Sequence, residues 1–282
     1  MYTLLQVLKK IFFWVVMNLI ECIQSILLGL VEGLTEFLPV SSTGHLIIAG
    51  NLLGYTGEQA KTFEIAIQLG AILAVCWHYR VRLTHTIQGL TGDKTSQRFA
   101  FNLILAVIPA AVMGLALHGL IKKYLFNPVS VAIALAVGGF IILLVERRER
   151  VPRITDIGQL SWQDALKLGF AQVFALFPGT SRSGATIIGG MLFGLSRQAA
   201  TEFSFFLAIP TMFLATGYEL YHSWHSLLQQ DLPFFATGFV VSFFSALMAI
   251  RGLLWYVANH DFRFFAYYRI VLALIVLAYF FL

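Results

Sequence analysis

How this chain folds is decided by residues 32–45, which read Glu32-Gly33-Leu34-Thr35-Glu36-Phe37-Leu38-Pro39-Val40-Ser41-Ser42-Thr43-Gly44-His45. Glu32 and Glu36 are four residues apart, so a helix would present both on one face. Two like charges at this spacing indicate that a positive group lies beside them. Pro39 predicts the end of that helix, and the small hydroxyl-bearing residues after it predict the start of another. At membrane depth, such a polar break must face protein or a water-filled cavity, because lipid cannot hydrogen-bond the freed backbone.

A second polar stretch reads Pro178-Gly179-Thr180-Ser181-Arg182-Ser183-Gly184-Ala185-Thr186. Small and hydroxyl-bearing residues surround one arginine, with glycines where the backbone must approach another group closely. Successive amides ahead of a helix N-terminus form an anion site. Arg182 adds a forked, permanently charged partner for phosphate. The two stretches therefore predict the two halves of one site. The first half would carry the metal ligands and the nucleophile, and the second would hold the phosphate.

The composition is that of an integral membrane protein. Of the 282 residues, 59% are hydrophobic and only 12% are charged, with a mean hydropathy of +0.80. The apolar runs predict six spanning helices at about 61–77, 99–118, 128–145, 199–221, 234–250 and 267–282. The two polar stretches lie in separate re-entrant helical hairpins, the first made of helices 21–38 and 45–53 and the second within 162–194. The fold class is thus an all-α polytopic membrane protein.

The basic residues indicate orientation rather than nucleic-acid binding, because the net charge is only +5. Assigning the connections 78–98, 146–153 and 251–269 to the cytoplasm satisfies the positive-inside rule. The first hairpin then enters from outside and the second from the cytoplasm. Aromatic and histidine residues near span ends, among them Trp224 and His225, are predicted at the membrane interface.

The chain contains an internal repeat. A shift of 140 residues aligns Ser41 with Ser181 and Gly44 with Gly184 without a gap, and it also aligns Gly29 with Gly169. Three spans separate the two hairpins, and an odd number inverts the second copy. We therefore expect an apolar extension at 1–20, a first inverted repeat at 21–153 and a second at 154–282. The acidic pair occurs only in the first copy and Arg182 only in the second, as a divided active site would require.

The Glu-x-x-x-Glu pair followed by Pro-Val-Ser-Ser-Thr-Gly-His, with Pro-Gly-Thr-Ser-Arg-Ser-Gly-Ala-Thr later, resembles the undecaprenyl-pyrophosphate phosphatases, also called bacitracin-resistance proteins. The resemblance runs from about Glu21 to the C-terminus, and the extension before Glu21 departs from it. It implies an inner-membrane hydrolase that converts undecaprenyl pyrophosphate to undecaprenyl phosphate and inorganic phosphate. It also implies a divalent cation, Mg²⁺ or Ca²⁺, and a site open to the periplasmic side.

Each polar residue of the first stretch has an expected role. Glu32 and Glu36 would hold the cation, with Glu36 also acting as a base. Ser42 would be the nucleophile, although it could instead be a helix N-cap, and Ser41 is a second candidate. His45 would be a general acid or base.

Arg182 would bind the phosphate and offset the charge that develops on it. The other residues expected to bind the substrate phosphates are Ser41, Thr43, Gly179, Thr180, Ser181, Ser183 and Thr186.

A transporter or lipid-carrier flippase is the competing function, because inverted repeats with broken helices are also a transporter plan. A serine, carboxylate and arginine together exceed what binding requires, so hydrolysis is favoured. The expected partners are the polyprenyl pyrophosphate and the bilayer, with no nucleic acid. The sequence leaves open whether a phosphoserine forms or water attacks directly, and whether the chain is a homodimer.

Overall fold

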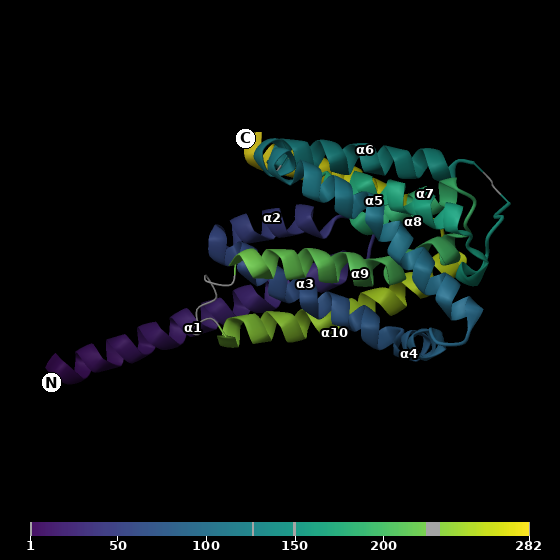
Figure 1. Ribbon diagram of the computed structural model, residues 1–282. Coiled ribbons are helices and arrows are strands. Elements are labelled where there is room, and N and C mark those ends of the chain that lie inside the picture. Colours follow the sequence, from purple (N-terminus) through teal and green to yellow (C-terminus); the bar gives the residue numbers. More distant parts are fainter. Residues whose placement is uncertain (1, 126, 149–150, 224–231, 282) are drawn as a thin grey trace.

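A computed structural model describes residues 2–125, 127–148, 151–223 and 232–281, and this part of the chain is helical without any named strand. Figure 1 shows the helices as one bundle, with the N-terminal part of the first helix extending beyond it. The helices are α1 (Tyr2–Thr35), α2 (Ser42–Leu52), α3 (Glu58–His78), α4 (Arg80–Gly89), α5 (Lys94–Tyr124), α6 (Pro128–Glu146), α7 (Trp162–Val173), α8 (Arg182–Leu192), α9 (Arg197–Ser223), α10 (Leu232–Asn259) and α11 (Arg263–Phe281), with short 3₁₀ turns at Ile157–Gln159 and Phe174–Leu176.

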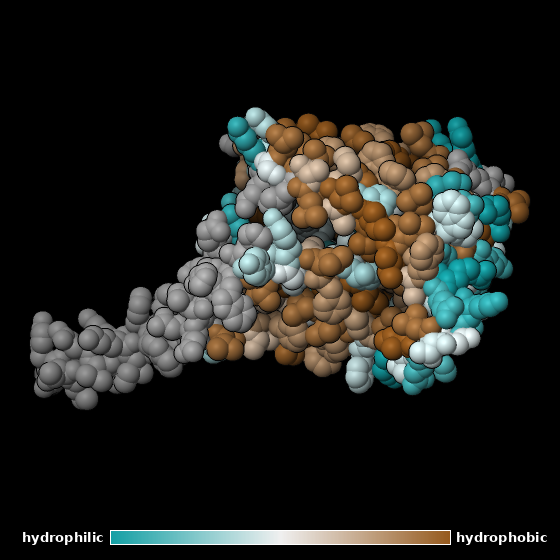
Figure 2. Space-filling model, in the orientation of Figure 1, coloured by the Kyte–Doolittle hydropathy of each residue, from teal (hydrophilic) through white to brown (hydrophobic). Residues whose placement is uncertain are grey.

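Six of these helices, α3, α5, α6, α9, α10 and α11, are long and apolar enough to cross a membrane. This confirms the six predicted spans. Figure 2 shows a broad hydrophobic surface along the flank of the bundle that faces the viewer, and hydrophilic residues gathered at the end where α4 lies. A multi-pass membrane protein requires this distribution, because lipid surrounds its flanks and water its ends.

The two predicted helix breaks are present, at 36–41 between α1 and α2 and at 177–181 between α7 and α8. The second helix of each pair begins in the same unusual way. Ser41 and Ser181 have φ angles of 71° and 74°, and they are the only non-glycine residues with positive φ in the described ranges. Each caps its helix by accepting a hydrogen bond from a glycine amide, that of Gly44 at 3.4 Å or Gly184 at 3.0 Å. Residues 140 apart in sequence therefore have the same local geometry.

The packing around the two breaks is also alike. The first helix of each pair packs on a spanning helix, α1 on α10 and α7 on α5. A Cβ at Gly29 would lie 2.6 Å from the Gly238 carbonyl oxygen of α10, and one at Gly169 would lie 2.6 Å from the Ala106 carbonyl oxygen of α5. Glycine is needed at both places because no side chain fits between the backbones.

Several boundaries differ from those predicted. The first helix ends at Thr35 rather than Leu38, and α1 is continuous from Tyr2, so the segment before Glu21 extends it. The 78–98 connection contains a helix of its own, α4. Trp224 and His225 lie outside the described residues.

The predicted connection at 251–269 was wrong. Helix α10 continues to Asn259 and α11 begins at Arg263, so only 260–262 connect them. Arg251 is an exposed residue of α10, whereas Arg269 is almost fully buried in α11. The positive-inside rule favours a loop position for these arginines, because a charge inside a span is expensive unless it is satisfied. Backbone carbonyl groups satisfy Arg269, as described below.

Candidate functional site

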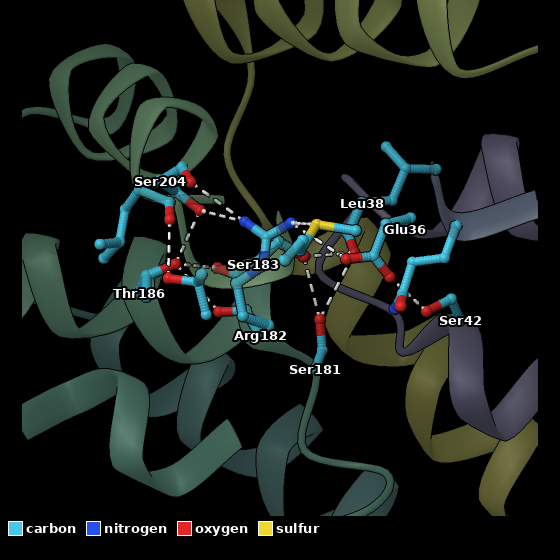
Figure 3. A network of polar contacts seen from close by, with 12 residues as sticks. Glu36, Leu38, Ser42, Ser181, Arg182, Ser183, Thr186 and Ser204 are labelled. Carbon is cyan, nitrogen blue, oxygen red and sulfur yellow. Dashed lines mark hydrogen bonds and ion pairs between the residues drawn. The ribbon is translucent and has the colours of Figure 1, made fainter. Parts of the chain in front are cut away.

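The two helix breaks, which we call the first tip (36–41) and the second tip (177–181), meet inside the bundle (Figure 3). Ser183 Oγ at the start of α8 donates a hydrogen bond of 2.7 Å to the carbonyl oxygen of Leu38 in the first tip. Ser181 Oγ lies 3.5 Å from the same oxygen and 3.0 Å from Ser183 Oγ. Two residues predicted to bind phosphate thus join the tips to each other.

Glu36 contacts the first residue of α2 and the first residue of α8. Its Oε2 accepts a hydrogen bond of 2.5 Å from Ser42 Oγ, and its Oε1 accepts one of 3.0 Å from Arg182 Nη2. The side chains of Glu36 and Arg182 are only 9% and 11% exposed, so this ion pair is largely shielded from solvent. The acidic and basic halves, which lie 146 residues apart in sequence, form one polar centre.

The two serines of the first tip have separate roles in the fold. Ser41 is the N-cap of α2, and its side chain accepts the Gly44 amide. Ser42 is the first residue of α2, and its hydroxyl is directed to the Glu36 carboxylate instead. A hydroxyl in close contact with a carboxylate is the arrangement of a nucleophile and its base. In the structure it is Ser41, and not Ser42, that occupies the N-cap position of α2.

Arg182 is held in place but keeps one unused donor. Its Nη1 donates to the Ser204 carbonyl oxygen at 3.0 Å, its Nη2 lies 3.4 Å from Met212 Sδ, and its guanidinium lies 5.6 Å from the centre of the Phe37 ring. Its Nε is buried without a hydrogen-bond partner. A charged donor left unpaired in a buried site is costly unless a ligand meets it.

Ser204 is a site residue that sequence reasoning missed. Besides accepting from Arg182, it shares a 2.6 Å hydrogen bond with Thr186 Oγ1. Thr186, predicted as a phosphate ligand, thus supports the residue that anchors Arg182. Ser204 lies in the spanning helix α9, where a serine has no flanking motif to distinguish it from one that packs between helices.

Glu32 satisfies the conditions for a cation ligand only together with other groups. It is 2% exposed, and its Oε1 has no hydrogen-bond partner. Within the described ranges, no group of three or more His, Cys, Asp and Glu side chains could hold a metal by itself. Carboxylate and hydroxyl oxygens suit Mg²⁺ and Ca²⁺, and Mg²⁺ is commonly held by one or two carboxylates completed by substrate phosphates. The residues present fit a cation bound in that way.

Comparison with known proteins identifies the family of this chain. The family model described as bacitracin resistance protein BacA matches residues 25–275. The chain belongs to the BacA family. It is 56% identical over 262 residues to an undecaprenyl-diphosphatase of Aromatoleum aromaticum, covering 93% of this chain and 96% of that protein. It is 58% identical over 264 residues to undecaprenyl-diphosphatase 2 of Rhodospirillum rubrum, with coverage of 93% and 96%. It is 56% identical over 262 residues to an undecaprenyl-diphosphatase of Ectopseudomonas mendocina, with coverage of 93% and 95%. The predicted family is confirmed.

In this BacA-family chain, His45 is directed away from the polar centre. Its Nδ1 lies 2.8 Å from the Ser41 carbonyl oxygen, and its Nε2 lies 2.6 Å from the Tyr268 hydroxyl. A carbonyl can only accept, so Nδ1 carries a proton, and Nε2 shares a hydrogen bond with the Tyr268 hydroxyl. The structure does not bring His45 to Ser42 or Glu36.

The remaining predicted phosphate ligands are Thr43, Gly179 and Thr180. Thr43 is half-buried in the first turn of α2. Gly179 has a φ of 93°, and a Cβ there would lie 2.5 Å from the Val131 carbonyl oxygen, so only glycine fits this turn. The carbonyl groups of Gly179 and Thr180 both accept from Arg269, the second residue that the sequence did not reveal.

Proposed function

We propose that this chain is an undecaprenyl-diphosphatase that hydrolyses undecaprenyl pyrophosphate to undecaprenyl phosphate and inorganic phosphate. This reaction would recycle the lipid carrier of cell-envelope synthesis and so confer bacitracin resistance. The observation that carries the proposal is that Glu36 joins a serine of one hairpin to an arginine of the other. The names of the 53–58% identical relatives support it.

In the first step, Ser42 Oγ attacks the terminal phosphorus while Glu36 Oε2, 2.5 Å away, takes its proton. The Oγ–P bond forms as the bond from phosphorus to the bridging oxygen breaks, and the departing lipid phosphate receives the proton from Glu36. In the second step, Glu36 removes a proton from water as the water oxygen attacks the phosphoserine. That proton passes to Ser42 Oγ as inorganic phosphate leaves.

Arg182 has two functions in this scheme. Its Nη2 orients the Glu36 carboxylate, and its buried, unpartnered Nε is available to a phosphoryl oxygen. A fixed cation near the developing charge stabilises the transition state more than the ground state. Glu32 and Glu36 would hold the divalent cation, which when bound offsets the negative charge of the pyrophosphate.

We further propose that the fold is an inverted repeat whose two re-entrant hairpins meet near the middle of the bilayer. The matching serine caps and the matching glycine contacts support two copies of one unit. In Figure 1, α2 and α8 lie toward opposite ends of the bundle, as an inverted pair would. The positive-inside rule then puts the end with α4 in the cytoplasm of a bacterial inner membrane and the site toward the periplasm.

The experiment is phosphate release from undecaprenyl pyrophosphate by the purified chain in detergent, where transport has no meaning. We expect Mg²⁺- or Ca²⁺-dependent release by the wild type, lost in Arg182→Ala and retained in Arg153→Ala. Arg153 is a matched control because it is an exposed arginine paired with Asp164 outside the site. No release by folded wild type with metal and lipid present would refute the hydrolase and leave the transporter.

A further inference from the structure

Among the described residues, Arg269 is the largest fully buried side chain, with 1% of its surface exposed. Every hydrogen bond that the structure assigns to its guanidinium goes to a backbone carbonyl group. Nη1 donates to Pro39 (3.0 Å) and Thr180 (2.8 Å), Nη2 to Gly179 (3.0 Å) and Ala134 (3.1 Å), and Nε to Leu135 (3.2 Å).

These bonds use all the donors that the residue has. A guanidinium carries five N–H groups in a fixed fork, and five carbonyl groups accept from them. No donor is left for a substrate oxygen. Arg182 differs in this respect, because its buried Nε has no partner. The two arginines near the hairpin tips therefore have different roles. Arg269 binds only backbone carbonyl groups, and only Arg182 can bind phosphate directly.

The carbonyl partners of Arg269 lie directly ahead of the reacting residues. Pro39 precedes Ser42 by three residues in the first tip, and Gly179 and Thr180 precede Arg182 in the second. The other two carbonyl groups, of Ala134 and Leu135, belong to the spanning helix α6. Arg269 thereby connects both tips to this helix. One side chain from α11 thus fixes the two tips relative to each other and to the bundle.

The bonds also orient the peptide units. In a planar trans peptide the carbonyl and the following amide point in opposite directions. Because the Thr180 carbonyl points to Arg269, the amide of Ser181 points away from it. Fixing these peptide planes fixes the direction in which α8 starts, and with it the direction of Arg182.

Burying a charge for this purpose is expensive, and an apolar side chain of similar size would stabilise a bundle at least as well. The neighbouring helix is also shaped to admit the group. A Cβ at Gly138 of α6 would overlap Arg269 Nη2. Both observations favour a role in geometry rather than in stability.

We infer that Arg269 is a positioning residue, which holds the tips of the two hairpins in the register that sets Ser42 and Arg182 on either side of Glu36. This inference rests on the proposed function for its kinetic test and on the fold alone for its structural test. Its signature is a loss of turnover from a folded protein that still binds the lipid.

The kinetic test compares wild type, Arg269→Lys, Arg269→Met and Arg263→Met, each measured at the same interval below its own melting temperature. Arg263 is the matched control because it lies on the same helix, is 51% exposed and pairs with Asp261. For Arg269→Met we expect kcat to fall at least about 100-fold while KM changes less than about threefold. Arg269→Lys should restore part of kcat, because an ammonium keeps the charge and three donors. A kcat for Arg269→Met within threefold of wild type would overturn the inference.

The structural test uses hydrogen exchange measured by mass spectrometry and needs no activity. Exchange in peptides covering both tips, 36–44 and 177–186, should speed up together at least about tenfold in Arg269→Met and not in Arg263→Met. Unchanged exchange at either tip would refute the bridge, whatever the catalytic result. If Arg269→Met does not fold, Gly138→Ala displaces the guanidinium without removing its charge. It should lower kcat, whereas Gly252→Ala, where a Cβ meets no atom within 4 Å, should not.

Discussion

The ion pair between Glu36 and Arg182 allows stability and catalysis to be separated by mutation. Arg182→Met removes the charge but keeps an unbranched stem of similar reach. It leaves the Glu36 carboxylate, 9% exposed, without its cation, and breaking a buried pair in this way costs about 3 kcal/mol or more. Loss of the hydrogen bond to the Ser204 carbonyl adds about 1 kcal/mol. Arg182→Met should therefore be destabilised by about 4 kcal/mol.

Glu36→Gln in the same background removes the orphaned charge. The double variant should regain about 2 kcal/mol relative to the sum of the single changes, because no unpaired charge remains buried. Activity should not return. Loss of a fixed transition-state donor costs about 10²–10³ in kcat, and loss of the general base costs about 10²–10⁴.

The assay combines thermal unfolding in detergent with phosphate release from undecaprenyl pyrophosphate for the wild type, both single variants and the double variant. Arg251→Met serves as the control for removing an exposed arginine. A coupling energy below about 0.5 kcal/mol would show that the two groups act independently. Recovery of activity with stability in the double variant would refute their chemical roles.

Three further predictions follow from single groups. Ser41→Gly should keep kcat within about tenfold of wild type and change stability by only a few tenths of a kcal/mol, because glycine tolerates the φ of 71° and is an acceptable N-cap; a complete loss of activity would make Ser41 the nucleophile. Glu32→Gln should raise the Mg²⁺ concentration for half-maximal activity at least about tenfold, and a chelator should abolish wild-type activity; an unchanged metal dependence would remove Glu32 from the cation site. Burial alone would raise the pKa of Asp164, but hydrogen bonds from Arg153 and Ser161 hold that pKa below its ordinary value. This contribution is present above the ordinary pKa, near 4, and is lost as the pH falls through the lower folded value. The melting-temperature difference between wild type and Asp164→Asn should therefore be full at pH 7 and shrink toward pH 3, and a constant difference would contradict the assignment.

Much of the fold could be predicted because spans and breaks are set by local features of the sequence, namely the length of each apolar run and the position of helix-breaking residues. Each apolar run of spanning length became a helix, and the breaks fell where proline, glycine and capping serines cluster. The meeting of Glu36 with Arg182 was expected only because the repeat aligns the two polar stretches. The internal repeat put the two stretches at equivalent positions of two copies, and this equivalence predicted their meeting without any knowledge of tertiary contacts.

What the sequence could not reveal depends on contacts between distant segments. In the sequence, Arg269 could belong to a basic loop. The structure shows that it is buried in α11, where five carbonyl groups from α6 and both tips accept hydrogen bonds from it. Ser204 has no local signature, since only the packing of α9 on α8 brings it to Arg182. His45 follows the predicted nucleophile in sequence, yet the turn of α2 directs its ring to Tyr268.

The central claim is that Ser42 of one hairpin attacks a phosphate held by Arg182 of the other. The most direct test is the single-turnover rate of phosphate release from undecaprenyl pyrophosphate by Ser42→Ala, with saturating Mg²⁺ and a confirmed fold. We predict a rate at least about 10³-fold below wild type, with lipid binding retained. Release at a rate near that of wild type would contradict the claim and assign the attack to water or to another hydroxyl.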